Sequence, residues 1–154
     1  MSAVNGAHSH QNAPALLLPY SFTGTVIRGY GRGGKQLGCP TANLDGAAVA
    51  SIPASLPCGV YWGQGRVLRE GDQDASEVTG FVMSIGYNPQ FANKEKTMEV
   101  HFLREMDDFY GARVEGTIRG FLREMTSFKG LEELKVAIEK DKNDARALLI
   151  ASNK

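Results

Sequence analysis

The sequence lacks the features that mark several large classes of protein. Its only cysteines, Cys39 and Cys58, are too few for the disulfide framework of a small secreted domain, and we expect reduced thiols. Seventeen basic residues balance seventeen acidic ones, whereas a general nucleic-acid binder usually carries a basic excess. No apolar run approaches membrane-spanning length, and the N-terminus resembles neither a secretory signal nor a mitochondrial presequence. The sequence therefore predicts a cytoplasmic protein with no nucleic-acid or membrane partner.

The chain has the length of one domain with a sizeable core, since it contains 154 residues. Residues 1–17 are mostly small and polar, and we expect a flexible N-terminal tail. Residues 18–154 are expected to form a single domain.

Alternation of apolar and polar residues predicts a mainly β domain. β-Branched and aromatic residues recur with period two in five stretches, separated by turn residues. Residues 44–58, rich in Ala, Ser and Pro, are expected to form an irregular connection. Short strands at this spacing suggest a closed barrel or a sandwich. The five expected strands cover residues 21–28, 59–68, 78–86, 96–103 and 113–123.

The period changes from two to 3.6 after residue 130, which predicts a C-terminal helix to about Ser152. Gly130 is an acceptable N-cap, and two glutamates follow it near the positive end of the helix dipole. The expected buried stripe comprises Leu131, Leu134, Ile138, Asp141, Ala145 and Leu148.

The most distinctive stretch runs from Gly29 to Asn43, with five glycines in its first ten residues. Glycine lets the backbone approach another group closely, and backbone N–H groups beside cations such as Lys35 suit a polyphosphate. Thr41 and Asn43 offer a hydroxyl and an amide oxygen, which are ligands acceptable to Mg²⁺. The alternative for a Gly-rich stretch is a flexible surface turn.

Two familiar phosphate-binding motifs fit this stretch only in part. Gly29 and Gly34-Lys35 match the start of a P-loop, but Gln36 stands where a Ser or Thr is needed. Gly29, Gly31 and Gly34 match the dinucleotide fingerprint G-x-G-x-x-G. Both motifs require a helix to open immediately afterwards, which Gly38 and Pro40 disfavour. Both folds are therefore rejected, and only the phosphate-binding chemistry is kept.

Glu99 is the best candidate for a general base. It lies in a strand among apolar neighbours, where a carboxylate is costly unless it is paired or useful. His101 falls on the same face, together with Thr97 and Leu103, while Met98, Val100 and Phe102 point the other way. The alternatives are a solvated glutamate and a histidine that is merely packed.

Taken together, these pieces resemble the riboflavin kinase family, and specifically its monofunctional eukaryotic type. The resemblance covers Leu18 to about Leu149. Its most specific parts are Pro40-Thr41-Ala42-Asn43 and Met98-Glu99-Val100-His101. Further matching stretches are Leu18-Pro19-Tyr20, Arg28–Gly38, Gly59-Val60-Tyr61, Ser84–Pro89, Asp108–Gly111 and Gly120–Arg123.

The resemblance implies a six-stranded antiparallel Greek-key β-barrel with a C-terminal α-helix. It implies ATP-dependent phosphorylation of riboflavin at the ribityl 5′-hydroxyl to give FMN and ADP, by a chain that is expected to be a monomer without FAD-forming activity. The cofactor implied is Mg²⁺, or another divalent cation such as Zn²⁺ or Mn²⁺.

The resemblance also assigns roles to individual residues. Glu99 is the catalytic base, and Thr41 and Asn43 hold the metal. The ATP-binding residues are Arg28, Gly29, Gly31, Gly33, Gly34 and Lys35. The riboflavin-binding residues are Thr97, Arg104, Phe109, Tyr110 and Arg123. Two other hypotheses stay open, a flavin-binding module without catalysis and a small barrel that binds nucleic acid.

Overall fold

The computed structural model describes residues 17–27, 41–53, 55–68, 78–87, 96–104, 111–125 and 129–152. These residues form strands and helices in an order close to the expected one. The elements are β1 (Tyr20–Ile27), β2 (Thr41–Leu44), α3 (Gly46–Ala50), β3 (Gly59–Leu68), β4 (Thr79–Tyr87), β5 (Lys96–Phe102), β6 (Arg113–Arg123) and α4 (Leu131–Ser152).

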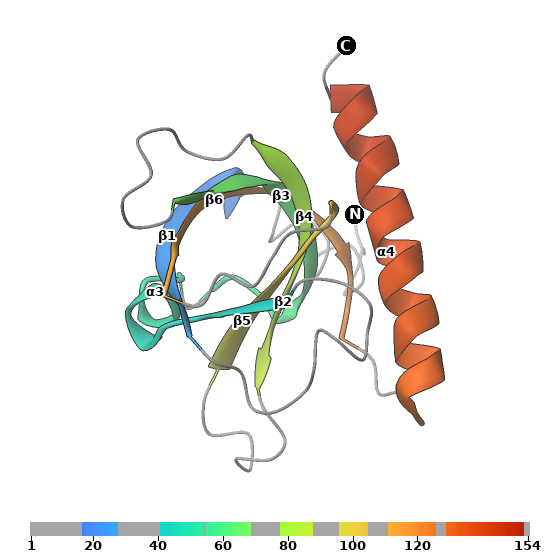
Figure 1. Ribbon diagram of the computed structural model, residues 1–154, viewed down its shortest axis with the longest axis horizontal. Coiled ribbons are helices and arrows are strands. Elements are labelled where there is room, and N and C mark those ends of the chain that lie inside the picture. Colours follow the sequence, from blue (N-terminus) through green and yellow to red (C-terminus); the bar gives the residue numbers. More distant parts are fainter. Residues whose placement is uncertain are drawn as a thin grey trace, which may run out of the picture.

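The six strands close into a barrel in the order β1-β2-β5-β4-β3-β6 (Figure 1). Every neighbouring pair is antiparallel. Strands β3, β4 and β5 follow one another, and β6 returns to lie beside β3, which is the Greek-key arrangement. The predicted barrel with a C-terminal helix is therefore confirmed.

The barrel interior is filled by every second side chain of the strands. On β5 the inward residues Met98, Val100 and Phe102 each have 0% exposure, as their alternation predicts. Phe81 lies between two other rings in edge-to-face contacts, with centroids 5.8 Å from Phe22 and 6.2 Å from Phe102. These contacts suit the quadrupoles of aromatic rings and help to define one packing of the core.

The connection between the second and third strands is more regular than expected. The sequence predicted an irregular segment over residues 44–58, but residues 46–50 form α3, and Thr41–Leu44 form the short strand β2. Asp45 caps the helix, since its Oδ1 accepts a hydrogen bond from the Ala48 N–H at 3.3 Å. Ala48 lies buried in the barrel core, so α3 covers part of the interior.

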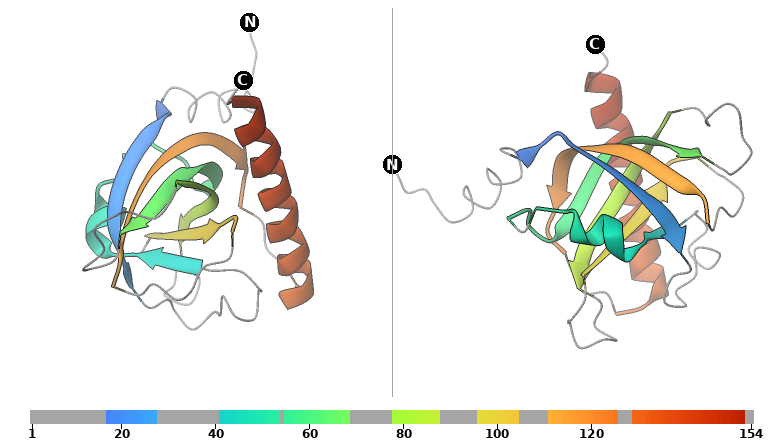
Figure 2. Two further views of the ribbon diagram at one scale, coloured as in Figure 1. Left: turned by 45° about the horizontal axis from the view of Figure 1, so that its top comes forward. Right: turned by 90° about the vertical axis from the view of Figure 1, so that its left-hand side faces the viewer.

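Helix α4 lies along the outer wall of the barrel, on the side opposite α3 (Figures 1 and 2). It packs over a second apolar cluster that includes Val60, Val82 and Ala145. Gly80 permits the close approach, because a Cβ there would lie 2.4 Å from Leu149 Cδ1. The helix bounds are as predicted, but the stripe is wrong at its end. Leu148 is 38% exposed, and the neighbouring Leu149 contacts the barrel instead.

The N-terminal boundary differs by one residue from the expected one. Leu17 was assigned to the flexible tail, yet it is half-buried against the barrel core together with Leu18. Of the helices within the described ranges, none combines the length and apolar character needed to cross a membrane.

We expect Gly63→Ala to destabilise the barrel. A Cβ at Gly63 would lie 2.1 Å from the Thr117 carbonyl oxygen and 2.8 Å from the Phe81 ring, so the backbone between β3 and β6 must shift. Overpacking of this kind costs roughly 1–3 kcal/mol, which lowers the melting temperature of a chain this size by about 2–12 °C. The matched control is Gly46→Ala, because nothing lies within 4 Å of that position. Equal melting temperatures for the two variants would contradict the prediction.

Candidate active site

Three of the predicted site residues lie in one row across the barrel wall. The strand register pairs Asn43 with Glu99, Glu99 with Ser84, Ser84 with Val60, and Val60 with Arg123. Directly paired residues point to the same face of a sheet. Since Met98 and Val100 point inward, the row lies on the outer face. It follows the curved wall for three inter-strand spacings from Glu99 to Arg123, roughly 14 Å along the wall, and helix α4 covers Val60 between them.

Asn43 presents a buried amide beside Glu99. It is 7% exposed, and no described residue hydrogen-bonds its side chain. An amide oxygen in this position is a ligand acceptable to a divalent cation. The backbone of Thr41 pairs with that of His101, two positions along β2 and β5 from the pair of Asn43 and Glu99.

The amide oxygen of Asn43 suits a hard divalent cation. In the part of the chain that the structure describes, no three His, Cys, Asp or Glu side chains lie together as a metal-binding group. A cation here would therefore depend on hydroxyl, amide and phosphate oxygens.

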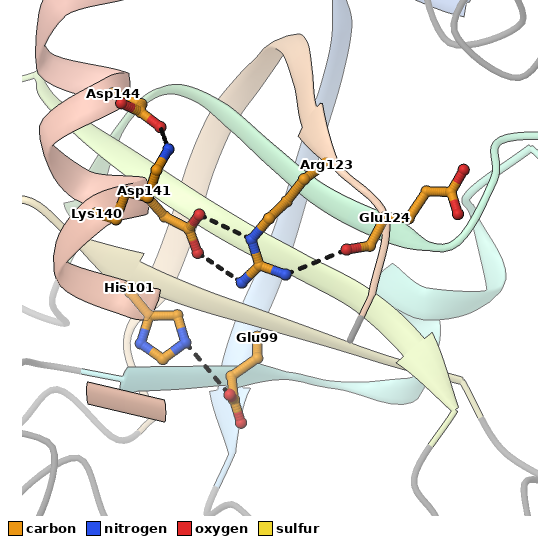
Figure 3. Close-up of polar contacts among 7 residues, drawn as sticks. All are labelled: Glu99, His101, Arg123, Glu124, Lys140, Asp141 and Asp144. Carbon is orange, nitrogen blue, oxygen red and sulfur yellow. Dashed lines mark hydrogen bonds and ion pairs between the residues drawn. The ribbon is translucent and has the colours of Figure 1, made fainter. Parts of the chain in front are cut away.

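Glu99 and His101 form a close polar contact on the outer face of β5 (Figure 3). His101 Nε2 lies 3.3 Å from Glu99 Oε1, and the two side chains are 4% and 31% exposed. Glu99 is thus reachable from solvent while its partner is enclosed. A carboxylate in this position can accept a proton from a substrate hydroxyl.

Arg123 is held by helix α4 at the other end of the row (Figure 3). Its Nε and Nη2 donate to the two carboxylate oxygens of Asp141 at 2.9 and 2.8 Å. Its Nη1 also donates to the Glu124 carbonyl oxygen at 3.1 Å. The Asp141 side chain is 5% exposed, so its charge depends on this bidentate partner. The sequence placed Asp141 on the buried stripe but did not predict its partner. A carboxylate on an apolar helix face is the signal that could have found it.

Of the remaining predicted riboflavin-binding residues, the structure describes Thr97 and Arg104. Thr97 lies two residues before Glu99 on the same face of β5, and its hydroxyl donates to the Gly86 carbonyl at 3.3 Å. Arg104 is exposed beyond the end of β5. Phe109 and Tyr110 lie outside the described residues.

The predicted ATP-binding residues, Arg28, Gly29, Gly31, Gly33, Gly34 and Lys35, also lie outside the described residues. The two strands that flank them are described, however. Ile27 at the end of β1 pairs with Asn43, and Thr41 opens β2. The described residues on either side of 28–40, Ile27 and Thr41, therefore both lie close to Asn43 in the strand pairing.

An open groove of about 1030 Å³ lies on a different wall, formed by β1, β6 and α3 with part of β3. Its lining includes Thr23, Arg66, Arg113 and Glu115, and none of the predicted site residues belongs to it. Strand β6 is opposite β5 in the barrel order. Size alone therefore does not mark the site, and the polar row remains the better candidate.

The architecture is that of a small closed β-barrel with a polar site on its outer wall, and comparisons with known proteins identify its family. The family model "Flavokinase: Riboflavin kinase" matches residues 16–149. The riboflavin kinase of Homo sapiens is 41% identical over 133 residues, which cover 86% of this chain and 82% of that protein. The chain belongs to the riboflavin kinase family.

Two further relatives agree with this assignment. The bifunctional riboflavin kinase/FMN phosphatase of Arabidopsis thaliana is 41% identical over 132 residues, covering 85% of this chain and 33% of that protein. The crystal structure of riboflavin kinase from Trypanosoma brucei superposes with a TM-score of 0.67 at 31% identity, covering 85% of this chain and 80% of that one.

We expect Asp141→Asn to destabilise the docking of α4 on the barrel. The substitution keeps the shape of the side chain but removes the charge that faces Arg123. Loss of a buried, charge-assisted pair costs roughly 1–3 kcal/mol, which chemical denaturation can measure. Asp144→Asn is the matched control, because its pair with Lys140 lies on the exposed face of the same helix, with side chains 46% and 75% exposed. That variant should unfold like the wild type. Equal losses in the two variants would contradict the assigned importance of the Arg123 pair.

Proposed function

We infer that this chain phosphorylates riboflavin at the ribityl 5′-hydroxyl, using ATP and giving FMN and ADP. The observation that carries this inference is the family match over residues 16–149, in which the paired positions of Asn43 and Glu99 supply the chemistry that the reaction needs. Phosphoryl transfer depends mainly on positioning and on neutralisation of charge, with little covalent help from the protein.

Glu99 acts as the general base in this proposal. Its half-exposed carboxylate accepts the proton of the 5′-hydroxyl as that oxygen attacks the γ-phosphorus. The bond between the γ-phosphorus and its bridging oxygen breaks, and ADP leaves. The base is on β5, which is hydrogen-bonded to β2 on one side and β4 on the other. The backbone of Glu99 is therefore held in place relative to both neighbouring strands.

Asn43 and Thr41 would hold the divalent cation, for which Mg²⁺ is our first choice and Zn²⁺ or Mn²⁺ the alternatives. The buried amide of Asn43, with no partner among the described residues, supports this assignment. When bound, the cation neutralises charge on the phosphate oxygens. The chain itself contributes the oxygen ligands and their fixed spacing from Glu99.

The nucleotide phosphates are proposed to bind the backbone and cations of Arg28, Gly29, Gly31, Gly33, Gly34 and Lys35. The pairing of Ile27 with Asn43 supports this, because it anchors the start of that segment beside the proposed cation. A phosphate chain that touches both the segment and Asn43 would therefore approach Glu99.

Riboflavin is proposed to bind with its 5′-hydroxyl at Glu99, and Arg123 is among its proposed contacts. Thr97 is available on the same face of β5. Arg104, Phe109 and Tyr110 complete the proposed flavin contacts.

We also propose that the chain works as a cytoplasmic monomer, with a flexible tail before the barrel and without nucleic-acid or membrane partners. The balance of seventeen basic and seventeen acidic residues supports the absence of nucleic acid. Light scattering of the purified protein tests the monomer.

We expect Glu99→Gln to lower kcat for FMN formation by roughly 10²–10⁴-fold, the usual contribution of a positioned general base. Riboflavin and ATP binding should change little, because the amide keeps the size of the side chain. The matched control is Glu115→Gln on β6, which removes an exposed carboxylate from the opposite wall and should retain full activity. A Glu99→Gln enzyme within a few-fold of wild type would refute the role of Glu99.

We expect Thr41→Val to weaken Mg²⁺-dependent binding of ADP by about tenfold, the order of one hydrogen bond or ligand contact. Valine keeps the shape and suits a strand, so the fold should persist. Calorimetric titration of Mg²⁺ADP measures the effect. Thr79→Val at the far end of β4 is the control, since Thr79 pairs with Gly65 and lies five residues from Ser84. Unchanged affinity in Thr41→Val would make Thr41 a structural residue.

A further inference from the structure

Glu99 and His101 are in contact on the outer face of β5. The two residues are two apart on β5, so their side chains leave the same face of the strand. His101 Nε2 approaches Glu99 Oε1 to 3.3 Å (Figure 3). The histidine is the more buried partner, with 4% of its side chain exposed against 31% for the glutamate.

The two side chains differ in how firmly the barrel holds them. His101 pairs with Val82 on β4 and with Thr41 on β2, so its backbone lies in the interior of the sheet. Its enclosed imidazole has only two rotatable bonds. Glu99 has a longer side chain that is partly in solvent, and a free side chain of this type keeps much rotamer entropy. Contact with a fixed ring removes part of that freedom before substrate binds.

We propose that His101 is a positioning residue for the reaction, and that its Nε2–H donates a hydrogen bond to Oε1 of Glu99 and orients the carboxylate toward the substrate hydroxyl. The proposal rests on the proposed role of Glu99 as the base. His101 does not touch substrate and acts only through Glu99.

Orientation of the carboxylate affects the chemical step more than it affects the binding of riboflavin or ATP. The proposal therefore predicts an effect on kcat with little effect on KM.

Two amide substitutions at position 101 distinguish the effect of losing the hydrogen bond to Glu99 from the effect of losing a buried ring. The side-chain nitrogen of glutamine stands at the same number of bonds from Cβ as Nε2, whereas that of asparagine corresponds to Nδ1. His101→Gln keeps a donor within reach of Glu99, and His101→Asn withdraws it. We expect His101→Asn to lower kcat about tenfold, the effect of one hydrogen bond to a charged group, with both KM values within twofold. His101→Gln should recover kcat to within threefold of wild type.

The double variant Glu99→Gln/His101→Asn tests whether His101 acts through Glu99. Single-turnover formation of FMN, with enzyme in excess, measures even slow variants. We expect the single-turnover rate of the double variant to match that of Glu99→Gln within twofold. A residue that acts only by orienting the Glu99 carboxylate has no further effect once that carboxylate is removed. Multiplied losses would show an independent role for His101 and overturn the proposal.

The hydrogen bond can also be observed without turnover. The chain has only three histidines, so ¹⁵N-edited spectra of the imidazoles can assign His101 by comparison with His101→Gln. We expect Nε2 to carry a proton in the wild type and its shift to change in Glu99→Gln. An unprotonated Nε2 would overturn the proposal even where the position 101 variants unfold.

The outcomes distinguish this proposal from the proposed function. Wild-type kcat in His101→Asn, with Glu99→Gln strongly impaired, would reject the positioning role and leave the base in place. Wild-type kcat in Glu99→Gln would reject both. Equal losses in His101→Asn and His101→Gln, accompanied by lower melting temperatures, would assign His101 to packing alone and also overturn the proposal.

Discussion

The burial of alternate residues of β5 inside the barrel determines where the candidate active site lies. Met98, Val100 and Phe102 are fully enclosed, and a shift of register by one residue would bring Thr97, Glu99 and His101 into the core instead. Burial of unpaired polar groups costs several kcal/mol, so the apolar residues fix the register strongly. The same packing that stabilises the barrel therefore holds the proposed base on the outer wall.

The outer wall is partly covered by helix α4 and partly polar, and Arg123 lies at the boundary between the two parts. Helix α4 covers the apolar part, around Val60 and Val82, so Val60 separates Arg123 from the polar residues of the row. The bidentate pair of Arg123 with Asp141 satisfies the enclosed carboxylate at this boundary. A lone buried charge would be unfavourable there, but two well-aligned hydrogen bonds offset much of the cost of desolvation.

The sequence predicted the elements with strong periodicity and missed the short ones. Strand β6 and helix α4 have the predicted bounds because each contains several repeats of its period. Strand β2 has four residues and helix α3 has five, too few for a pattern to emerge from Ala, Ser and Pro. Asp45 followed by an alanine-rich run was the available signal for α3. The sequence also placed Leu148 rather than Leu149 against the barrel. Which of two adjacent leucines of a helix is buried depends on the surface against which the helix packs, and a local pattern does not contain that surface.

The candidate residues could be named from the sequence, but their arrangement in a row could not. Asn43, Glu99 and Arg123 are far apart in the chain, and only the closed order of the strands makes Asn43 and Glu99 neighbours and brings Arg123 into the same row. That order depends on tertiary pairing between β2 and β5 and between β3 and β6, which local patterns do not encode. The sequence did not reveal the partner of Asp141 for the same reason: Arg123 lies eighteen residues before it, on a different element.

A row of this kind suits phosphoryl transfer, because the reaction needs several groups at fixed separations more than it needs a reactive side chain. Neighbouring strands provide such separations at about 4.8 Å per step, and hydrogen bonds on both sides hold β5 in the wall. The Gly-rich residues 28–40 begin and end at strands that this wall also fixes. The barrel can therefore keep Glu99, Asn43 and the two ends of that segment in register with one another. Its apolar interior, which touches no substrate, is the physical origin of the precision of the site.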